Sequence, residues 1–236
     1  MSSFKFKHFI IEQANSAMKV GTDAMILGAM IDCSKNKNGL DIGAGTGVLS
    51  LMVAQKNTEI LIDSIDIDEF SVKECRFNFE HSQWTNRLSC WETSFEDYVS
   101  DKKYDLIFSN PPFYATSNLN NDARKAQARH QESLPAKIVL GRVNELLTSL
   151  GEFWVIIPST ERDKWTSLGA LKGLSIKKAI SIRGNKEKEI NRVVICFDRL
   201  SMHTHECSFT VRNTDNSYSQ EYIELTRNFH AVDLRK

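Results

Sequence analysis

The sequence has no net charge, few cysteines and no long apolar run, and each absence excludes a class of protein. Its 236 residues carry 30 basic and 30 acidic side chains, so nucleic-acid binding would need a local basic patch rather than bulk charge. The five cysteines are scattered and form no C-x-x-C pair, which is typical of reduced cytosolic thiols. No apolar run approaches the roughly 20 residues of a membrane span, and the stretch MSSFKFKHFI lacks the apolar region of a signal peptide. We therefore expect a cytoplasmic protein with no membrane attachment.

Short apolar strands alternate with helices along the chain, which predicts an α/β fold. This alternation is typical of a parallel sheet with helices on both faces. Two later β-rich runs, 174–184 and 190–200, have no helix between them and are expected to pair as a late antiparallel hairpin at one edge. The other expected strands are 39–45, 59–68, 87–93, 104–110 and 152–158, and the expected helices are 47–55, 69–82 and 134–151. The last helix is expected to end on Gly151 as a C-terminal cap.

These elements predict one domain built on a doubly wound, mostly parallel sheet of seven strands. No internal repeat, low-complexity tract or long linker divides the chain. Residues 39–200 would form the sheet, residues 1–38 would cover a cofactor or substrate, and residues 201–236 would be a C-terminal extension. Ligands of such sheets bind at the carboxyl ends of the strands, near the topological switch point. Those ends fall at 43–47, 66, 93–95 and 110–113.

The stretch LDIGAGTG (40–47) joins a strand to a helix through three glycines. Gly43, Gly45 and Gly47, with Ala44 between the first two, allow positive φ angles and let a ligand approach the backbone closely. The spacing G-x-G-x-G is neither the dinucleotide fingerprint G-x-G-x-x-G nor a P-loop. Because no pattern for binding pyrophosphate is present, the loop favours a nucleoside ligand that carries none.

Two aspartates flank this loop. Asp66, followed by Ile67, ends the second strand about 20 residues after the loop, where a carboxylate can accept hydrogen bonds from both ribose hydroxyls. Asp41 stands just before the loop, where it could orient the loop or meet a cationic ligand. A glycine-rich turn with solvated acids is the alternative, and it does not account for the combination of strand, glycines, helix and acid.

LDIGAGTG followed by IDID (65–68) resembles the S-adenosylmethionine site of the class I methyltransferases. The resemblance implies a Rossmann-like fold and S-adenosylmethionine as the cofactor, bound by the glycine loop, Asp66 and Ile67. Members of that class often have an acidic residue after the third strand that binds the adenine amino group. This chain has Ser94 and Phe95 there. We expect Ser94 to accept a hydrogen bond from the adenine and Phe95 to cover it.

The stretch YDLIFSNPPF (104–113) ends an apolar strand on two of the four prolines in the chain. Pro111 and Pro112 cannot extend a central strand, so they could serve only to end the strand and begin a loop. That role explains neither Asn110 nor Phe113. Beside a methyl donor, the Asn110 side-chain carbonyl and the Pro111 backbone carbonyl could accept the hydrogens of an exocyclic amine and free its lone pair for attack. The prolines would hold these dipoles in place before reaction. Phe113 would stack on the flat base.

This turn resembles the (Asp/Asn/Ser)-Pro-Pro-(Tyr/Phe) signature of the amino-group methyltransferases, which act on adenine N6, cytosine N4, guanine N2 or a glutamine amide. Glutamine methyltransferases usually carry a helical domain ahead of the glycine loop, whereas fewer than 40 residues precede it here. Restriction-system DNA enzymes usually add a large target-recognition domain, for which this chain has no room. Ribosomal RNA or a protein glutamine stays open as the acceptor, and a noncatalytic RNA-binding module is the alternative from another class.

Three stretches together resemble the bacterial tRNA(Val) adenine-N6 methyltransferases: AMKVGTDAMILGA (17–29), SNPPF, and the tail VRNTDNSYSQEYIELTRNF (211–229). Members of that family methylate the adenine directly 3′ of the anticodon, so the expected partner is a tRNA anticodon loop. The family often has Tyr where this chain has Phe113, a change that keeps stacking. The resemblance assigns Lys19, Gly21, Thr22 and Asp23 to a loop that closes over the cofactor. From the residues alone, this stretch could equally be a turn before a helix capped by Thr22 or Asp23.

RNA contacts must come from local charge, since the chain has no net charge. The segment 123–130 follows the catalytic turn, and phosphate contacts are expected from Arg124, Lys125, Arg129 and His130. Lys186 and Arg192 belong to a basic cluster around the late hairpin. A solvated charged face explains that cluster equally well.

Neither a metal nor an oligomer is expected. His203, His205 and Cys207 share one face of a strand, but no fourth ligand has suitable spacing. We expect a monomer without a metal site.

Overall fold

The computed structural model describes residues 3–16, 18–113 and 135–235. Its central feature is an eight-stranded sheet in the order β10-β8-β9-β7-β6-β3-β4-β5. The strands from β5 to β7 in this order are parallel, β9 runs antiparallel to both β7 and β8, and β10 lies parallel to β8 at the edge. The strands are β3 (Asn38–Ile42), β4 (Leu61–Asp66), β5 (Leu88–Glu92), β6 (Tyr104–Ser109), β7 (Leu147–Pro158), β8 (Ser175–Asn185), β9 (Ile190–Asp198) and β10 (His205–Arg212).

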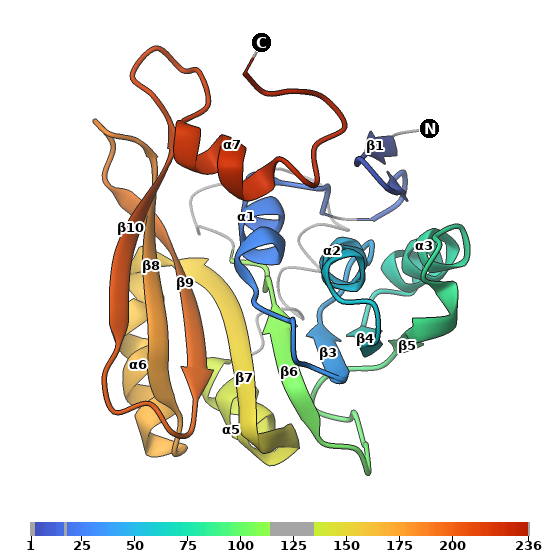
Figure 1. Cartoon of the computed structure of the whole chain (residues 1–236). Coiled ribbons are helices and arrows are strands. Elements are labelled where there is room, and N and C mark those ends of the chain that lie inside the picture. The colour runs from blue at the N-terminus through green and yellow to red at the C-terminus, as the bar shows by residue number, and fades with distance from the viewer. Residues whose placement is uncertain (1–2, 17, 114–134, 236) are drawn as a thin grey trace, which may run out of the picture.

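Helices cover both faces of this sheet (Figure 1). One face packs against α1 (Thr22–Met30), α2 (Val48–Lys56), α3 (Glu69–Glu80) and α7 (Gln220–Thr226). The other face packs against α5 (Ala136–Leu146) and α6 (Arg162–Leu171). Two short strands, β1 (Ser3–Lys5) and β2 (Ile10–Glu12), form a separate hairpin, and the 3-10 turns are η1 (Thr85–Arg87) and η2 (Ser159–Glu161). Among the described residues, no helix is long and apolar enough to cross a membrane.

The strand β7 illustrates why the sequences of the central strands contain continuous apolar runs. Successive side chains of a strand point to opposite faces, and both faces here are covered. Trp154 and Ile156 belong to the core beneath α1 and α2, whereas Phe153, Val155 and Ile157 belong to the core beneath α5 and α6. All five are almost completely buried. A strand buried on both faces is apolar at most positions rather than at alternate ones.

The two ends of the chain meet over α1 and α2. Phe6 forms an isolated antiparallel bridge with His230, and the Lys7 amide donates to the Phe229 carbonyl at 2.8 Å. The Gln55 side chain of α2 donates to the Asn228 carbonyl, also at 2.8 Å. The C-terminal extension is therefore packed against the N-terminal segment that precedes α1.

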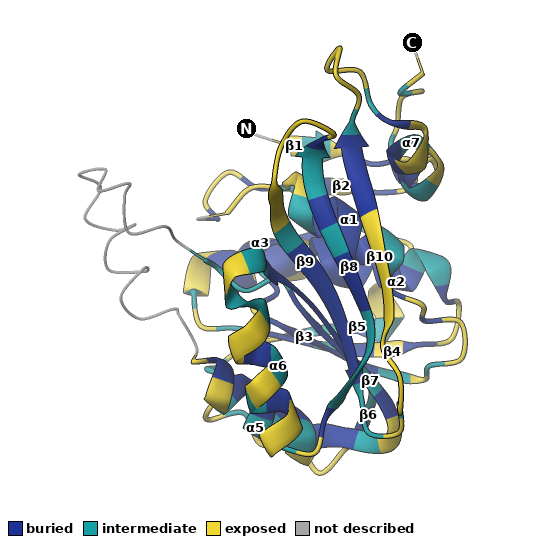
Figure 2. Cartoon of the chain, turned by 90° about the vertical axis from the view of Figure 1, so that its left-hand side faces the viewer, coloured by how far each residue is buried: buried dark blue, intermediate teal, exposed yellow. Residues whose placement is uncertain are grey.

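The expected alternation of strands and helices and the late antiparallel hairpin, β8 with β9, are confirmed. The expected place of the hairpin at the edge of the sheet is wrong, because β10 pairs with β8 on its outer side. The expected count of seven strands is wrong, because the extension 201–236 adds β10 beside β8. The first half of β10 is exposed and its second half is buried (Figure 2). The helices α6 and α7 have no counterpart among the expected elements.

The expected helix 134–151 is wrong at its C-terminal end. The helix α5 ends at Leu146 and β7 begins at Leu147, so Gly151 lies inside a strand and is no helix cap. Leu147 pairs with Tyr104 of β6. A Cβ atom on Gly151 would lie 2.7 Å from the Leu147 side chain and 2.9 Å from the Tyr104 carbonyl. Leu147 and residues 152–155 pair with β6, so the stretch between them belongs to a strand, although no local pattern in the sequence indicates this pairing.

Candidate active site

A pocket opens at the carboxyl ends of β3, β4 and β6, where the strand order reverses. The glycine loop forms its floor, the ends of β4 and β5 form one wall, and the N-terminal segment and the turn after β6 form the other. Its lining residues are Met18, Lys19, Val20, Ala24, Ile42, Gly43, Ala44, Gly45, Thr46, Val48, Leu49, Ile65, Asp66, Ile67, Ser71, Thr93, Ser94, Phe95, Glu96, Ser109, Asn110, Pro111, Pro112 and Val139. Residues expected from four separate strand ends therefore lie around one pocket.

The three glycines of the loop have positive φ angles, +68°, +55° and +79° for Gly43, Gly45 and Gly47. A Cβ atom added to Gly43 or Gly45 would meet nothing within 4 Å. At Gly47, by contrast, it would lie 2.5 Å from Phe79 and 2.8 Å from the sulfur of Cys75. Gly43 and Gly45 thus present bare backbone to the pocket. Gly47 does not line the pocket, and its lack of a side chain lets the loop pack on α3.

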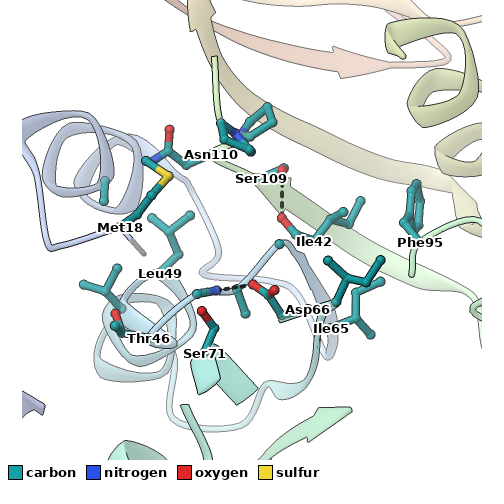
Figure 3. A pocket seen from close by; sticks show the side chains of 18 of the residues that line it. Met18, Ile42, Thr46, Leu49, Ile65, Asp66, Ser71, Phe95, Ser109 and Asn110 are labelled. Carbon is teal, nitrogen blue, oxygen red and sulfur yellow. Dashed lines mark hydrogen bonds between the residues drawn. The ribbon is translucent and has the colours of Figure 1, made fainter. Parts of the chain in front are cut away.

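Asp66 lies at the pocket beside the glycine loop (Figure 3). Its Oδ2 atom accepts the Gly45 amide at 2.7 Å, and its Oδ1 atom accepts the Asp68 amide at 2.9 Å. Burial raises the pKa of Asp66, while these backbone donors lower it. Each carboxylate oxygen has a further lone pair, so Asp66 can still accept hydroxyl groups of a ligand.

Asp41 lies beneath the loop and does not line the pocket. It is 0% exposed, and its Oδ2 atom accepts the Ser50 hydroxyl at 2.7 Å. The Ser50 hydroxyl also lies 2.9 Å from that of Ser64, and the Asp41 Oδ1 atom has no partner among the described residues. Burial raises the pKa of Asp41 to about 7. The expectation that Asp41 could contact a cationic ligand is wrong, because its side chain is fully buried and does not line the pocket.

The wall after β5 combines apolar surface with a few polar groups. Ile67 is 51% exposed and Phe95 is only 2% exposed, and both line the pocket. The Ser94 hydroxyl donates to Asp97 at 2.7 Å and accepts the Asp97 amide at 3.0 Å, which leaves it one acceptor lone pair. Glu96 lines the pocket close by. An exposed isoleucine beside hydrogen-bond acceptors suits a flat heterocycle with an amino group.

The turn after β6 lines the pocket with Asn110, Pro111 and Pro112. Figure 3 shows Asn110 on the side of the pocket where Met18 lies, away from Phe95. The Ser109 hydroxyl donates to the Ile42 carbonyl at 2.8 Å, which ties the end of β6 to β3. Phe113 does not line the pocket. Its half-buried ring packs edge-on against the buried Trp165, with 6.3 Å between ring centroids.

The segment before α1 contributes Lys19 to the pocket, whereas Gly21, Thr22 and Asp23 do not line it. The helix α1 begins at Thr22 with Gly21 as its N-cap, and no side chain caps it, so the expected cap by Thr22 or Asp23 is wrong. Asp23 instead pairs with Arg192 of β9 at 2.8 Å. Their separation of 169 residues hides this pair from any local pattern.

The expected RNA-contacting residues have different surroundings. Lys186 is exposed in the turn between β8 and β9, but Arg192 already pairs with Asp23. Arg124, Lys125, Arg129 and His130 lie outside the described residues.

Several lining residues had not been expected from the sequence. Ala24, Leu49 and Ser71 belong to the first turns of α1, α2 and α3. For Leu49 and Ser71 the available signal is their position, because α2 and α3 follow strands of the central sheet and the N-termini of such helices point toward its ligand edge. Met18 and Val20 carry no signal beyond their place beside Lys19.

Comparisons with known proteins agree with this geometry. Residues 12–161 match the family model described as methyltransferase small domain. The tRNA1(Val) (adenine(37)-N6)-methyltransferase of Flavobacterium psychrophilum is 35% identical over 230 residues, which cover 96% of this chain and 98% of that protein. The protein of the same name from Flavobacterium johnsoniae is 37% identical over 231 residues, with the same shares covered.

Solved structures show the same fold at low sequence identity. A predicted O-methyltransferase from Agrobacterium tumefaciens has a TM-score of 0.68 at 13% identity and covers 88% of this chain and 96% of its own. A ribosomal protein L11 methylase from Lactobacillus delbrueckii subsp. bulgaricus has a TM-score of 0.57 at 16% identity, with 80% and 83% covered. These likenesses establish the architecture alone.

Proposed function

Because this chain belongs to the methyltransferase small domain family, we propose that it transfers a methyl group from S-adenosylmethionine to the exocyclic N6 of adenine in tRNA. The acceptor is the adenine 3′ of the anticodon of tRNA(Val), as the names of the full-length relatives suggest. The observation that carries this proposal is the shared pocket of the glycine loop, Asp66 and the Asn110-Pro111 turn.

The residues around the pocket fit the methyl donor. The bare backbone at Gly43 and Gly45 admits a ligand at close range, and Asp66 keeps lone pairs for the ribose hydroxyls. Ile67 and Phe95 would hold the adenine, and Ser94 or Glu96 would accept its amino group. Bound S-adenosylmethionine supplies an electrophilic methyl group on its sulfonium. The carboxylates of Asp66 and Glu96 line the pocket and suit a ligand with a positive centre, whereas the Lys19 ammonium donates to the backbone carbonyls of Gln13 and Ala14.

The turn after β6 would act on the acceptor. We assign the Asn110 side-chain carbonyl and the Pro111 backbone carbonyl as acceptors for the two hydrogens of the adenine amine. That arrangement favours a tetrahedral nitrogen whose lone pair is free to attack the methyl group. Pro112 stiffens the turn, so the dipoles need no reorganisation during reaction. The proton is then released to water, and no side chain is assigned as a general base.

Binding of tRNA requires groups around this turn. We assign base stacking to Phe113, whose ring is only partly buried, and phosphate contacts to Lys186 and the segment 123–130. We also infer that residues 1–236 act as one methyltransferase domain and as a monomer.

Methyl transfer to tRNA that lacks the modification tests this function. Labelled S-adenosylmethionine, total tRNA and nucleoside analysis should yield N6-methyladenosine. Asn110→Ala should lower turnover by about 10²-fold or more, because a preorganised acceptor for the reacting amine is lost. Its affinity for S-adenosylhomocysteine should stay within about threefold, since other residues hold the donor.

Asn191→Ala is the matched control, because Asn191 is exposed on β9 and away from the pocket. It should leave turnover unchanged. Label in ribosomal RNA or a protein fraction, with none in tRNA, would contradict the tRNA assignment. If the wild-type chain and Asn110→Ala bind RNA equally well and the wild-type chain transfers no methyl group, the chain would instead be a noncatalytic RNA-binding module.

A further inference from the structure

Glu74 and Asn78 are polar side chains that the proposed chemistry does not use. They lie one turn apart on α3, they are 8% and 2% exposed, and neither lines the pocket. A buried carboxylate is costly unless it is well hydrogen-bonded. Its partners therefore indicate why it is there.

Glu74 holds the N-terminal strap, which we define as residues 12–16 and 18–20. Its Oε1 atom accepts the Asn15 amide at 2.6 Å. Its Oε2 atom accepts the Ser16 amide at 2.9 Å and the Ser16 hydroxyl. One carboxylate thus satisfies three donors, two of them backbone groups that belong to no regular element.

Asn78 ties the same strap to the glycine loop. Its Oδ1 atom accepts the Glu12 amide at 2.8 Å, and its Nδ2 atom donates to the Glu12 carbonyl at 3.0 Å and the Thr46 carbonyl at 2.9 Å. The side-chain amide therefore pairs with Glu12 as a neighbouring strand would. The floor of the pocket and the strap share this anchor.

The far end of the strap reaches the pocket. Met18, Lys19 and Val20 line it. The buried Gln13 accepts the Val20 amide at 2.7 Å, and the Lys19 ammonium donates to the Gln13 carbonyl and, at 3.2 Å, to the Ala14 carbonyl. Hydrogen bonds thus connect the pocket wall to Gln13. The nearby residues Asn15 and Ser16 are in turn hydrogen-bonded to Glu74.

We propose that Glu74 is a positioning residue that sets the affinity of this enzyme for its methyl donor by holding the strap against the pocket. Asn78 fixes the strap relative to the glycine loop. Without these anchors the wall made by Met18, Lys19 and Val20 would have to become ordered when the donor binds, and the cost would appear as weaker binding. The proposal rests on the proposed function for the identity of the donor.

Calorimetric binding of S-adenosylhomocysteine tests the proposal without tRNA. Glu74→Ala should raise Kd about tenfold, the factor that corresponds to loss of roughly one hydrogen bond to a charged group. Glu74→Gln keeps one carbonyl oxygen and should give an intermediate Kd. The KM for S-adenosylmethionine should rise by the same factor, with kcat within about twofold. Glu80→Ala, at an exposed site on the same helix, should match the wild type.

Hydrogen exchange on the ligand-free protein gives a second readout. The amides of Asn15, Ser16 and Val20 should exchange faster in Glu74→Ala, while those of β3 and α2 should not change. Should Glu74→Ala fold poorly, Gln13→Ala loosens the strap without altering α3 and should also raise Kd.

The possible outcomes separate the two proposals. An unchanged Kd alongside faster exchange in the strap would overturn the positioning role and leave the proposed function intact. Expected shifts in Kd without methyl transfer to tRNA would overturn only the tRNA substrate. Failure of the wild-type chain to bind S-adenosylhomocysteine would overturn both.

Discussion

Asp41 and Asp66 are aspartates at or near the ends of neighbouring strands, yet the fold gives them different surroundings. Asp66 borders the pocket and accepts two backbone amides. Asp41 is sealed beneath the glycine loop with two serine hydroxyls. We therefore assign ligand contact to Asp66 and support of the loop to Asp41.

The buried Asp41 should make stability depend on pH. Burial raises its pKa to about 7, above the value of about 4 in an unfolded chain. Between these values the native protein keeps a proton that the unfolded chain releases. The contribution of this group to stability is thus fully present below about pH 4 and is lost as the pH rises to about 7.

Asp41→Asn should flatten this profile. Between pH 5 and pH 8, the fall in the free energy of unfolding should be smaller than in the wild type by about 2 kcal/mol. Urea unfolding at both pH values measures it, whatever the absolute stability of the variant. The exposed Asp101 supplies the control, Asp101→Asn. Parallel profiles for Asp41→Asn and the wild type would show that Asp41 is ionised throughout.

At the scale of elements, the glycine loop serves two purposes within five residues. Gly45 faces open space and Gly47 faces α3, although both have positive φ angles. We therefore infer a ligand-binding role for Gly45 and a packing role for Gly47. Both roles arise because the loop that connects β3 to α2 has the pocket on one side and packs against α3 on the other.

Alanine substitutions should separate these roles. Gly47→Ala forces a methyl group against Phe79 and Cys75 and should lower the free energy of unfolding by about 3 kcal/mol. Gly45→Ala should cost only about 1 kcal/mol of backbone strain. It should weaken S-adenosylhomocysteine binding about tenfold or more, because its methyl group occupies the ligand's space. Urea unfolding and calorimetry measure the two effects, and equal losses of stability would contradict the assignment.

At the scale of the whole molecule, the C-terminal extension is part of the sheet. The strand β10 covers the edge of β8, and α7 packs above it with Phe209, Tyr222 and Phe229 in the core shared with α1 and α2. An uncovered β8 would present unpaired backbone groups to other chains. The extension therefore protects the edge and joins the two ends of the chain.

A chain that ends at residue 200 should not form a stable soluble monomer. It would expose Ile180 and Ile182 and lose the contacts of Phe209, Tyr222 and Phe229. Size-exclusion chromatography and thermal melting should show aggregation or a melting temperature lower by at least 10 °C, the shift expected for several kcal/mol in a domain of this size. Removal of residues 231–236 alone should change little, because residues 231–233 and 235 are exposed and Leu234 is the one half-buried apolar side chain among 231–235. A monomeric 1–200 fragment with the original melting temperature would contradict this account.

Local sequence patterns are sufficient to predict much of the fold and of the candidate site of this protein. The alternation of strands and helices, the glycine loop, Asp66 at a strand end and the Asn110-Pro111-Pro112 turn are visible because each depends on neighbours in the chain. Parallel strands bring their carboxyl ends to one edge. A common pocket at this edge therefore follows from the sequence pattern.

Tertiary contacts decide the remaining features. Leu147 and Glu152 pair with β6 on either side of Gly151, which therefore lies inside a strand. Burial separates Asp41 from the pocket that Asp66 borders. Asp23 and Arg192 form their pair across 169 residues. Glu74 accepts the amide of Ser16, from which it is separated by 58 residues in the sequence. Spacing along the chain carries no information about such partners, because they are set by which surfaces the folded sheet brings together.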